Sequence, residues 1–427
     1  MGLNSTSKRF VCKFKSLSLY RRKESPSPHT LLCDLPLELV KLVASSLQPA
    51  DLGALRMTCK VLYGKASSVF WSASLQSIKT DLSRANLGEL ETISRDAQLW
   101  HYVKHMVFTG FDECLENLGE GYKWGSHRHQ SGHLVNLQEH PAVKRLGEIL
   151  CQLVNCKSFE IHAVITKVRD QSDNDNFRPT DSITALLDIV ARTHHPVTAL
   201  IVNFMDESNY APDPQRLRVS DKDQFIAIGQ HLEELKLIYE LDDGIVRDWT
   251  FNMLLHTPNL RMLHLKGLGL SGGTELIHRL ASAGPPWSQL QELHLKCIPA
   301  SIEDLMVLLQ RCRHSLRVFK IDIMRMYANV EDIKQMLRTL SISFPALESV
   351  SFNSFTLGVV RRDYFIHFPV VTENPFVDES QGTKFEFATN NTRGWPRVFR
   401  VAYSGPKMDV ALDILARTVD GAPASIS

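Results

Sequence analysis

The glycine pattern at residues 267–272 is the feature most suggestive of small-molecule chemistry. It reads G-x-G-x-x-G and stands between a predicted strand at 261–266 and a predicted helix. Glycines in this context let a backbone approach the pyrophosphate of a dinucleotide at a helix N-terminus. The next strand, however, ends in Lys296 and Cys297, where an acidic residue would be needed to bind the ribose. Dinucleotide binding is therefore the weaker alternative, and one turn of a repeated unit is the preferred explanation.

Histidine and aspartate clusters raise the question of metal binding. Near Cys114, a glycine-rich stretch carries His127, His129, His133 and His140. Imidazoles are common zinc ligands, but no HExxH or CxxC pair anchors a tetrahedral set, so a mobile surface loop is favoured. Aspartates at 170, 173, 175 and 181 resemble a calcium loop, yet Phe177 and Arg178 occupy the ligand and glycine positions. With no catalytic motif either, we expect no catalytic residues, no metal and no cofactor.

Six basic side chains form the clearest candidate for a binding surface. They occupy alternate positions of four similar predicted strands and comprise Lys236, His264, Lys266, His294, Lys296 and Lys320. Adjacent parallel strands would bring equivalent residues to about 4.8 Å, where like charges repel. We therefore predict a basic concave strip that binds an acidic or phosphorylated segment of a protein target. The alternative is a solvated strand face, with charges balanced by local acids such as Glu234 and Glu292.

A recurring apolar pattern predicts the strands that would position this strip. The pattern Φ-x-x-Φ-x-Φ, where Φ is apolar, begins at residues 103, 156, 197, 232, 260, 290, 316 and 347. Its last three positions alternate as in a strand, and amphipathic helices are predicted between copies, at 181–194, 301–313 and 330–343. Strand and helix alternating at such intervals are typical of leucine-rich repeats, although the usual ninth-position Asn or Cys is missing. We predict an α/β fold with an irregular leucine-rich-repeat-like βα solenoid over 76–357; an ordinary α/β domain is the alternative.

Two segments interrupt or end this pattern. A loop insertion is expected at about 112–138, between the first two strand copies. Beyond residue 357 the pattern fades, but strands are predicted around 385–387 and 398–403 and a helix at 409–419. Because a solenoid needs a polar outer end, residues 358–427 are predicted to form a C-terminal cap, with target recognition as the alternative.

Residues 33–75 predict a separate module of three short helices. Leu35-Pro36 opens the first helix, Pro49 suits the first turn of the second, and Gly64 is expected to break the chain before the third. A module of this size buries little surface. Its open apolar stripe is therefore expected to pack on a partner or on the rest of the chain.

The same segment resembles a known family. DLPLELVKLVASSLQPADLGALRMTCKVLYGKASSVFW is similar to an F-box, especially those of filamentous fungi, in its Leu-Pro opening, Glu-Leu and Asp-Leu pairs, Cys-Lys and terminal Trp. The resemblance implies docking on the Skp adaptor of a cullin ubiquitin ligase. Positions that match the family, some as adaptor contacts and some as module core, are Leu35, Pro36, Leu39, Val43, Leu47, Leu52, Leu55 and Trp71. An ordinary helical subdomain is the alternative.

Residues 1–30 form a basic, serine-rich tail that is predicted to be disordered. Met1-Gly2 with Thr6 matches a myristoylation pattern, and Cys12 with the basic cluster could supply a second membrane signal. A mitochondrial presequence is another possibility. A solvated tail, or a weak nuclear-import patch, is the preferred interpretation.

Overall composition narrows the protein class. The chain has 427 residues and a net charge of +1, which argues against a generic nucleic-acid binder. No apolar run reaches the ~18 residues of a membrane helix, so no transmembrane segment is expected. Eight cysteines without a CxxC pair, and no secretory signal, predict a reduced protein of the cytoplasm or nucleus.

The resemblance to an F-box, taken with the predicted solenoid, implies a substrate-recognition subunit of an SCF-type ligase, with a Skp adaptor and a cullin scaffold as partners. A ligase-independent interaction scaffold that uses the same adaptor contact is the alternative. A nucleotide-binding enzyme is less favoured.

Overall fold

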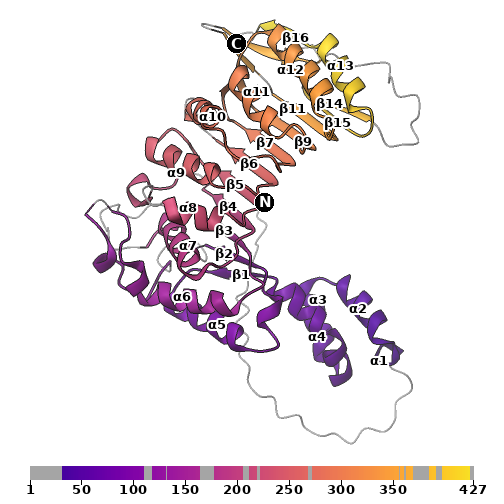
Figure 1. Cartoon of the computed structure of the whole chain (residues 1–427). Coiled ribbons are helices and arrows are strands. Elements are labelled where there is room, and N and C mark those ends of the chain that lie inside the picture. The colour runs from indigo at the N-terminus through magenta and orange to yellow at the C-terminus, as the bar shows by residue number, and fades with distance from the viewer. Residues whose placement is uncertain are drawn as a thin grey trace, which may run out of the picture. The chain divides into compact units, whose positions relative to one another are not determined.

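The chain is a mixed α/β protein made of two compact units, the first ending at Phe70 and the second running from Trp71 to Ser427 (Figure 1). The structure is a computed structural model. It describes residues 31–109, 118–130, 132–163, 177–204, 211–218, 222–267, 272–354, 356–359, 362–368, 384–390 and 397–423. Over these residues there are thirteen α-helices and sixteen strands.

The first unit is helical. Its helices are α1 (Leu31–Asp34), α2 (Leu37–Ser45), α3 (Pro49–Thr58) and α4 (Lys60–Leu75), the last of which continues past the unit boundary. Pro49 occupies the first turn of α3, as predicted, because its missing N–H is not needed there. The predicted break at Gly64 is wrong, since α4 runs through it. A single glycine costs a helix about 1 kcal/mol, which does not end one that is stabilised by packing.

The first unit has a small core. Ala44, Leu52 and Ala66 form its buried cluster, and the partly buried side chains that pack against this cluster are Leu47, Leu55, Val69 and Phe70. Helical spacing therefore directs only one narrow face of each helix inward, and much apolar surface is left outside.

The second unit is built on an eleven-stranded, mostly parallel sheet with the order β1-β2-β3-β4-β5-β6-β7-β9-β11-β15-β14. The strands are β1 (Ser77–Thr80), β2 (His105–Phe108), β3 (Ser158–His162), β4 (Ala199–Asn203), β5 (Glu234–Ile238), β6 (Met262–Lys266), β7 (Glu292–Lys296), β9 (Val318–Asp322), β11 (Ser349–Asn353), β15 (Arg397–Ser404) and β14 (Lys384–Asn390). The pairs from β1 to β11 are parallel, whereas β15 and β14 are antiparallel.

The eight strands predicted from the apolar pattern are all present, and they pair in chain order. Equivalent apolar residues lie in register, so that Leu235 pairs with Leu263 and Leu263 with Leu293. The leading apolar residue of each copy is also buried, as at Leu260 and Leu290. Strand β1 has no copy of the pattern and was not predicted.

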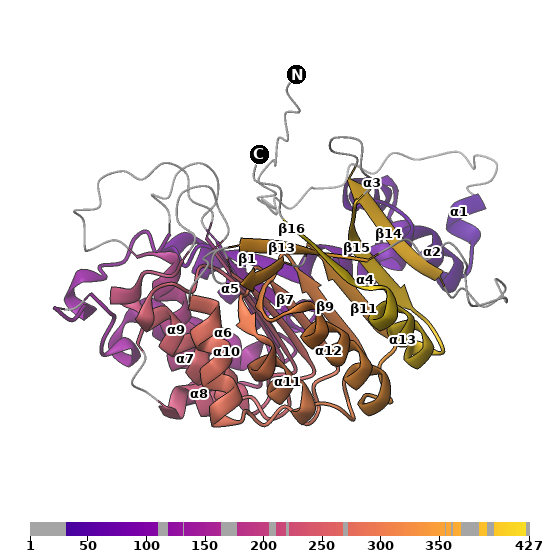
Figure 2. The ribbon, with the colours of Figure 1, turned by 90° about the horizontal axis from the view of Figure 1, so that it is seen from above.

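Helices cover one face of this sheet, as Figure 2 shows for α6 to α13. The other face is called the open face below, because alternate strand residues on it, such as Lys236, His264 and Lys320, are partly or fully exposed. The helices of the second unit are α5 (Arg84–Arg95), α6 (Pro141–Gln152), α7 (Pro179–Thr193), α8 (Lys222–Gly229), α9 (Gly244–Leu255), α10 (Gly272–Ala283), α11 (Ile302–Arg311), α12 (Val330–Ser343) and α13 (Met408–Thr418). Short 3-10 turns occur at Trp100–Tyr102, Gly125–His127, Leu137–Glu139 and Pro214–Arg216. The helices predicted around 181–194, 301–313, 330–343 and 409–419 correspond to α7, α11, α12 and α13. Among the described helices, none is long and apolar enough to cross a membrane.

A second sheet, with the order β16-β13-β12-β10-β8, was not predicted. Its strands are β8 (Ala300–Ser301), β10 (Arg325–Tyr327), β12 (Thr356–Val359), β13 (Arg362–His367) and β16 (Asp420–Pro423). The residues directly after β7, β9 and β11 are Cys297, Ile323 and Ser354, and their φ angles are 53°, 51° and 49°. This left-handed backbone precedes β8, β10 and β12 in turn. Because non-glycine residues rarely adopt it, the sequence does not indicate where these turns occur.

The stretch expected to be a mobile surface loop is instead packed, in the part that the structure describes. Trp124 and Leu134 are buried in the main core. Residues 358–427 likewise belong to the second unit, because β15 pairs with β11 and extends the large sheet.

Candidate functional site

Exposed apolar side chains gather on the helical unit. Seven of the fifteen large apolar side chains that are exposed among the described residues lie between residues 37 and 63, namely Leu37, Leu39, Leu42, Val43, Met57, Val61 and Tyr63. We call these seven the apolar surface. Such a concentration on a small unit is typical of a protein interaction site.

Helix α2 shows how the sequence separates core from surface. Val40 and Ala44 are buried one turn apart. Leu39 and Val43, also one turn apart, are 46% and 39% exposed, and Leu42 is 67% exposed. Residues four positions apart share a helix face, so α2 carries one buried stripe and one exposed apolar stripe.

The predicted adaptor-binding residues fall into three groups. Leu52 is buried, and Leu47 and Leu55 pack against it, so these three form core. Pro36, Leu39 and Val43 are exposed. Leu35 and Trp71 are half-buried, and Trp71 belongs to the second compact unit.

The sequence reasoning missed the most exposed members of the apolar surface. Leu42 and Met57 are 67% and 72% exposed, but neither matched a family position that was singled out. The signal was present in the helical periodicity, because Leu42 lies off the stripe that carries Val40 and Ala44.

Polar contacts of Lys65 and Arg56 hold the helices of this unit together. The Lys65 Nζ donates to the Cys33 carbonyl at 2.8 Å and to the Leu35 carbonyl at 2.6 Å. The Arg56 guanidinium lies 3.8 Å from the centre of the Phe70 ring. Hydrogen bonds therefore link the Leu35-Pro36 segment to α4, and a cation–π contact links α3 to the same helix.

The predicted basic residues lie on the open face of the large sheet, in the expected register. Lys236, His264, His294 and Lys320 form one row across β5, β6, β7 and β9. Lys266 pairs with Lys296 in the neighbouring row. These six residues are called the basic strip below.

The two histidines of the basic strip are stacked and neutral. Their rings are 4.2 Å apart between centroids, at an interplanar angle of 15°. Burial lowers the pKa of His264 to about 4, with a further contribution from His294 and the nearby lysines. Burial also lowers the pKa of His294. At neutral pH the row therefore contains two cations, at Lys236 and Lys320, and not four.

Ion pairs remove more of the repulsion expected from the sequence. Lys236 pairs with Glu234 at 2.5 Å, and Lys296 pairs with Asp322. The argument that four stacked cations require an anion is therefore wrong, because the imidazoles are neutral and acids balance two lysines. Over the residues that the structure describes, Lys266 and Lys320 have no such carboxylate partner.

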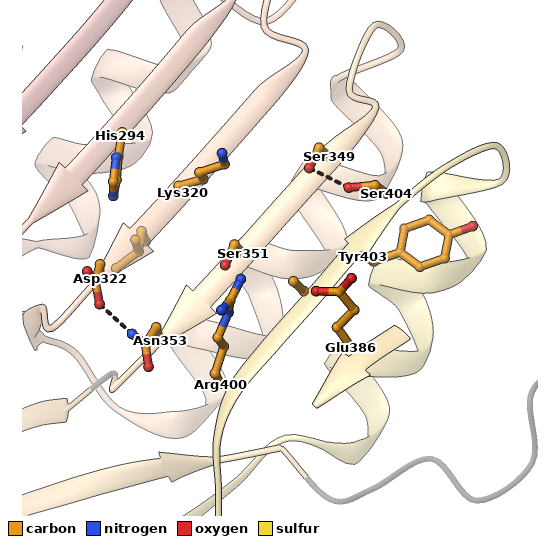
Figure 3. Close-up of a pocket in the computed structure, with 12 residues that line it drawn as sticks. His294, Lys320, Asp322, Ser349, Ser351, Asn353, Glu386, Arg400, Tyr403 and Ser404 are labelled. Carbon is orange, nitrogen blue, oxygen red and sulfur yellow. Dashed lines mark hydrogen bonds between the residues drawn. The ribbon is translucent and has the colours of Figure 1, made fainter. Parts of the chain in front are cut away.

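A pocket of about 420 Å³ lies at one end of the basic strip, against strands β9, β11 and β15 (Figure 3). His294 also lines it, and its main polar residues are Lys320, Asp322, Ser351, Asn353, Glu386 and Arg400. Arg400 was not predicted. It reaches this place because β15 pairs antiparallel to β11, which sets Arg400 opposite Asn353.

The pocket offers cationic groups on two sides of Ser351. Figure 3 shows Lys320 on one side, and Arg400 reaching toward Ser351 from the other. Asp322 is already engaged by Lys296 and by the Asn353 amide, which donates to it at 2.5 Å. Within the described part of the chain, neither Lys320 nor Arg400 forms an ion pair, so both can bind an anionic side chain.

The glycine pattern at 267–272 is explained by packing between neighbouring turns. A Cβ at Gly272 would lie 2.0 Å from the Leu241 carbonyl oxygen, and one at Gly267 would lie 2.9 Å from the Cys297 oxygen. The Gly272 amide, at the start of α10, donates to Asp242 Oδ1 at 2.9 Å. A carboxylate of the chain thus occupies the helix terminus where a pyrophosphate would bind. Gly269 lies outside the described residues.

Among the histidines around residue 130, His140 has a structural role. His140 is buried, stacks on Trp124 with centroids 3.7 Å apart, and accepts from the Ala142 amide at 3.2 Å. The described residues contain no group of three side chains that could hold a metal ion. Cys114 and the aspartates at 170, 173 and 175 lie outside the described residues, as do Gly2, Cys12 and the rest of the tail at 1–30.

No protein-family model matches the chain, and a search of curated proteins finds no match.

Proposed function

We propose that this chain is the substrate-recognition subunit of an SCF-type cullin ubiquitin ligase. The observation that carries the proposal is the apolar surface, found on a unit whose sequence resembles an F-box. A unit with so small a core gains stability when such a surface is covered. We propose that a Skp adaptor covers it and that a cullin scaffold binds through the adaptor.

The same proposal assigns a more specific fold to each of the two units. Helices α1–α4 would constitute the F-box module. The strand–helix units of the second compact unit would be an irregular leucine-rich-repeat-like solenoid, with residues 358–427, which include β14, β15 and α13, as its cap. The in-register leucine rows and the single helical layer support this interpretation.

The open sheet face would bind the protein target. Lys266, Lys320 and Arg400, which pair with no carboxylate among the described residues, favour an acidic or phosphorylated segment. The chain itself would perform no chemistry. It would hold target lysines near the conjugating enzyme, where proximity raises their effective concentration. The six cysteines within the described residues are free thiols, in keeping with a cytoplasmic or nuclear location.

Adaptor capture by surface variants tests the proposal. We expect Leu39→Asp and Val43→Asp, introduced in the full chain, each to reduce recovery of the Skp adaptor at least tenfold, because a charge would be buried in an apolar interface. Ser45→Asp is the matched control, since it places the same charge on an exposed part of α2 outside the apolar surface. Undiminished adaptor recovery with both apolar-surface variants would overturn the proposal.

The composition of the captured complex separates a ligase from a scaffold. Recovery of the adaptor together with a cullin supports a ligase subunit. Recovery of the adaptor alone, with tagged cullin present, supports the ligase-independent scaffold.

A further inference from the structure

Two cysteines of the helical unit lie side by side although 26 positions separate them in the chain. Cys33 lies in α1, and Cys59 stands between α3 and α4. Their Sγ atoms are 3.4 Å apart, and both residues are partly exposed thiols. A disulfide needs its sulfurs at about 2.05 Å, so a movement of about 1.4 Å would bring them to bonding distance.

The surroundings of Cys59 favour its thiolate. The Leu62 amide, in the first turn of α4, donates to Cys59 Sγ at 3.5 Å. This hydrogen bond, followed by that with Cys33, lowers the pKa of the Cys59 thiol. Burial instead raises the pKa of Cys156 and of Cys312 to about 12. Because the thiolate is the reactive form, Cys59 is the better nucleophile of these three.

We propose that Cys33 and Cys59 are a reversible redox pair that a peroxide oxidises to a disulfide. The Cys59 thiolate attacks one peroxide oxygen and the O–O bond breaks, which gives a sulfenic acid and, after protonation, water. The Cys33 sulfur then attacks the Cys59 sulfur, forming the S–S bond and expelling a second water. In sum, two thiols and one hydrogen peroxide give one disulfide and two waters, and each sulfur is oxidised by one electron.

The disulfide would add a covalent bond to the hydrogen bonds that hold α1 against α4. In the dithiol form, Lys65 links α4 to the carbonyls of Cys33 and Leu35. The new bond would join α1 to the α3–α4 junction and enclose α2 in a covalent ring. Restricting the unfolded chain in this way stabilises the enclosed segment. The inference concerns the helical unit alone and holds whether or not an adaptor binds there.

Peptide mapping of the full-length protein tests the bond. After hydrogen peroxide treatment and alkylation of remaining thiols, trypsin should release residues 24–41 joined to residues 57–60, two hydrogens lighter than the two peptides together. Dithiothreitol should restore both separate peptides. In Cys33→Ser the joined peptide should be lost, while dimedone should trap a sulfenic acid at Cys59.

Hydrogen exchange supplies a second readout and a control. Amides of α2 should exchange at least tenfold more slowly in the oxidised wild type, and peroxide should not slow them in Cys33→Ser. The exposed Cys151 reports whether peroxide merely oxidises any accessible thiol. Failure to obtain the joined peptide under conditions that oxidise Cys151 would overturn the proposal, as would a joined peptide found only in covalent dimers.

Discussion

Asp181 shows how one buried carboxylate can unite segments far apart in the chain. It is fully buried at the start of α7, where Arg128 and Arg216 bond its two oxygens at 3.1 and 2.7 Å. Arg128 comes from the stretch that was expected to be a mobile loop, so this ion pair helps to explain why the described part of that stretch is packed. In the sequence Asp181 belongs to a run of aspartates whose resemblance to a calcium loop was rejected because of Phe177 and Arg178, and the structure gives this carboxylate two guanidinium partners.

Replacing Asp181 by Asn should lower the free energy of unfolding by about 3 kcal/mol, because the two buried arginines lose the carboxylate that they share, while Arg216 keeps its ion pair with Asp213. Guanidinium chloride unfolding of the full chain measures this loss. Asp188→Asn is the control, since Asp188 pairs with Arg192 one turn away at the surface of the same helix and should cost less than 1 kcal/mol. Equal losses in the two variants would show that the buried ion pairs of Asp181 contribute no more to stability than a surface ion pair does.

His140 should make stability depend on pH. Burial lowers its pKa from 6.5 to about 4, so the unfolded chain binds the proton more tightly than the folded one. The contribution of neutral His140 is therefore complete above pH 6.5 and is lost as the pH falls from 6.5 toward 4. In His140→Asn, which keeps a cap acceptor for the Ala142 amide, the free energy of unfolding should fall less between pH 7 and pH 5 than in the wild type. A variant as pH-sensitive as the wild type would contradict this assignment.

At the scale of elements, the strands that could be predicted from the sequence are those whose apolar pattern is carried by several residues. Each predicted strand of the large sheet has three apolar residues directed at one core, such as Leu260, Leu263 and Leu265. The second sheet begins with strands of two to four residues, too short to show alternation, and each follows a left-handed residue that is not glycine. The apolar pattern along the chain therefore located the strands of the large sheet. The second sheet depends on tertiary packing, which no such pattern reports.

Ile323→Gly should raise the free energy of unfolding by about 1 kcal/mol. Ile323 has a φ of 51°, which is unfavourable for a β-branched residue, and it is 50% exposed, so little buried surface is lost with its side chain. Chemical denaturation of the full chain measures the change. Val307→Gly, at a similarly exposed position inside α11, should instead lower the value by about 0.5 kcal/mol or more. A loss of stability in Ile323→Gly would mean that its side-chain contacts outweigh the backbone strain.

At the scale of the molecule, the candidate target site was only partly readable from the sequence. Alternation along the strands placed the six basic residues in their rows, and that same register set Asp322 beside Lys296. The neutral state of His264 depends on burial, which the sequence does not report. Arg400 depends on which strand β15 joins and in which direction, and no local pattern specifies a pairing between segments about fifty residues apart.

The open sheet face should select acidic or phosphorylated peptides through the pocket beside Ser351. With Lys320→Glu and Arg400→Glu combined, the full chain should bind such peptides about tenfold more weakly or worse, because two charge-assisted contacts become repulsive. Fluorescence titration with matched phosphorylated and unphosphorylated peptides, drawn from a library enriched on the wild type, measures this loss. Arg317→Glu is the control, since Arg317 is exposed just before β9 and does not line the pocket. Wild-type binding should also weaken with added salt, as expected for exposed charges. A library that shows no acidic preference, or a double variant that binds as the wild type does, would assign target recognition to another surface.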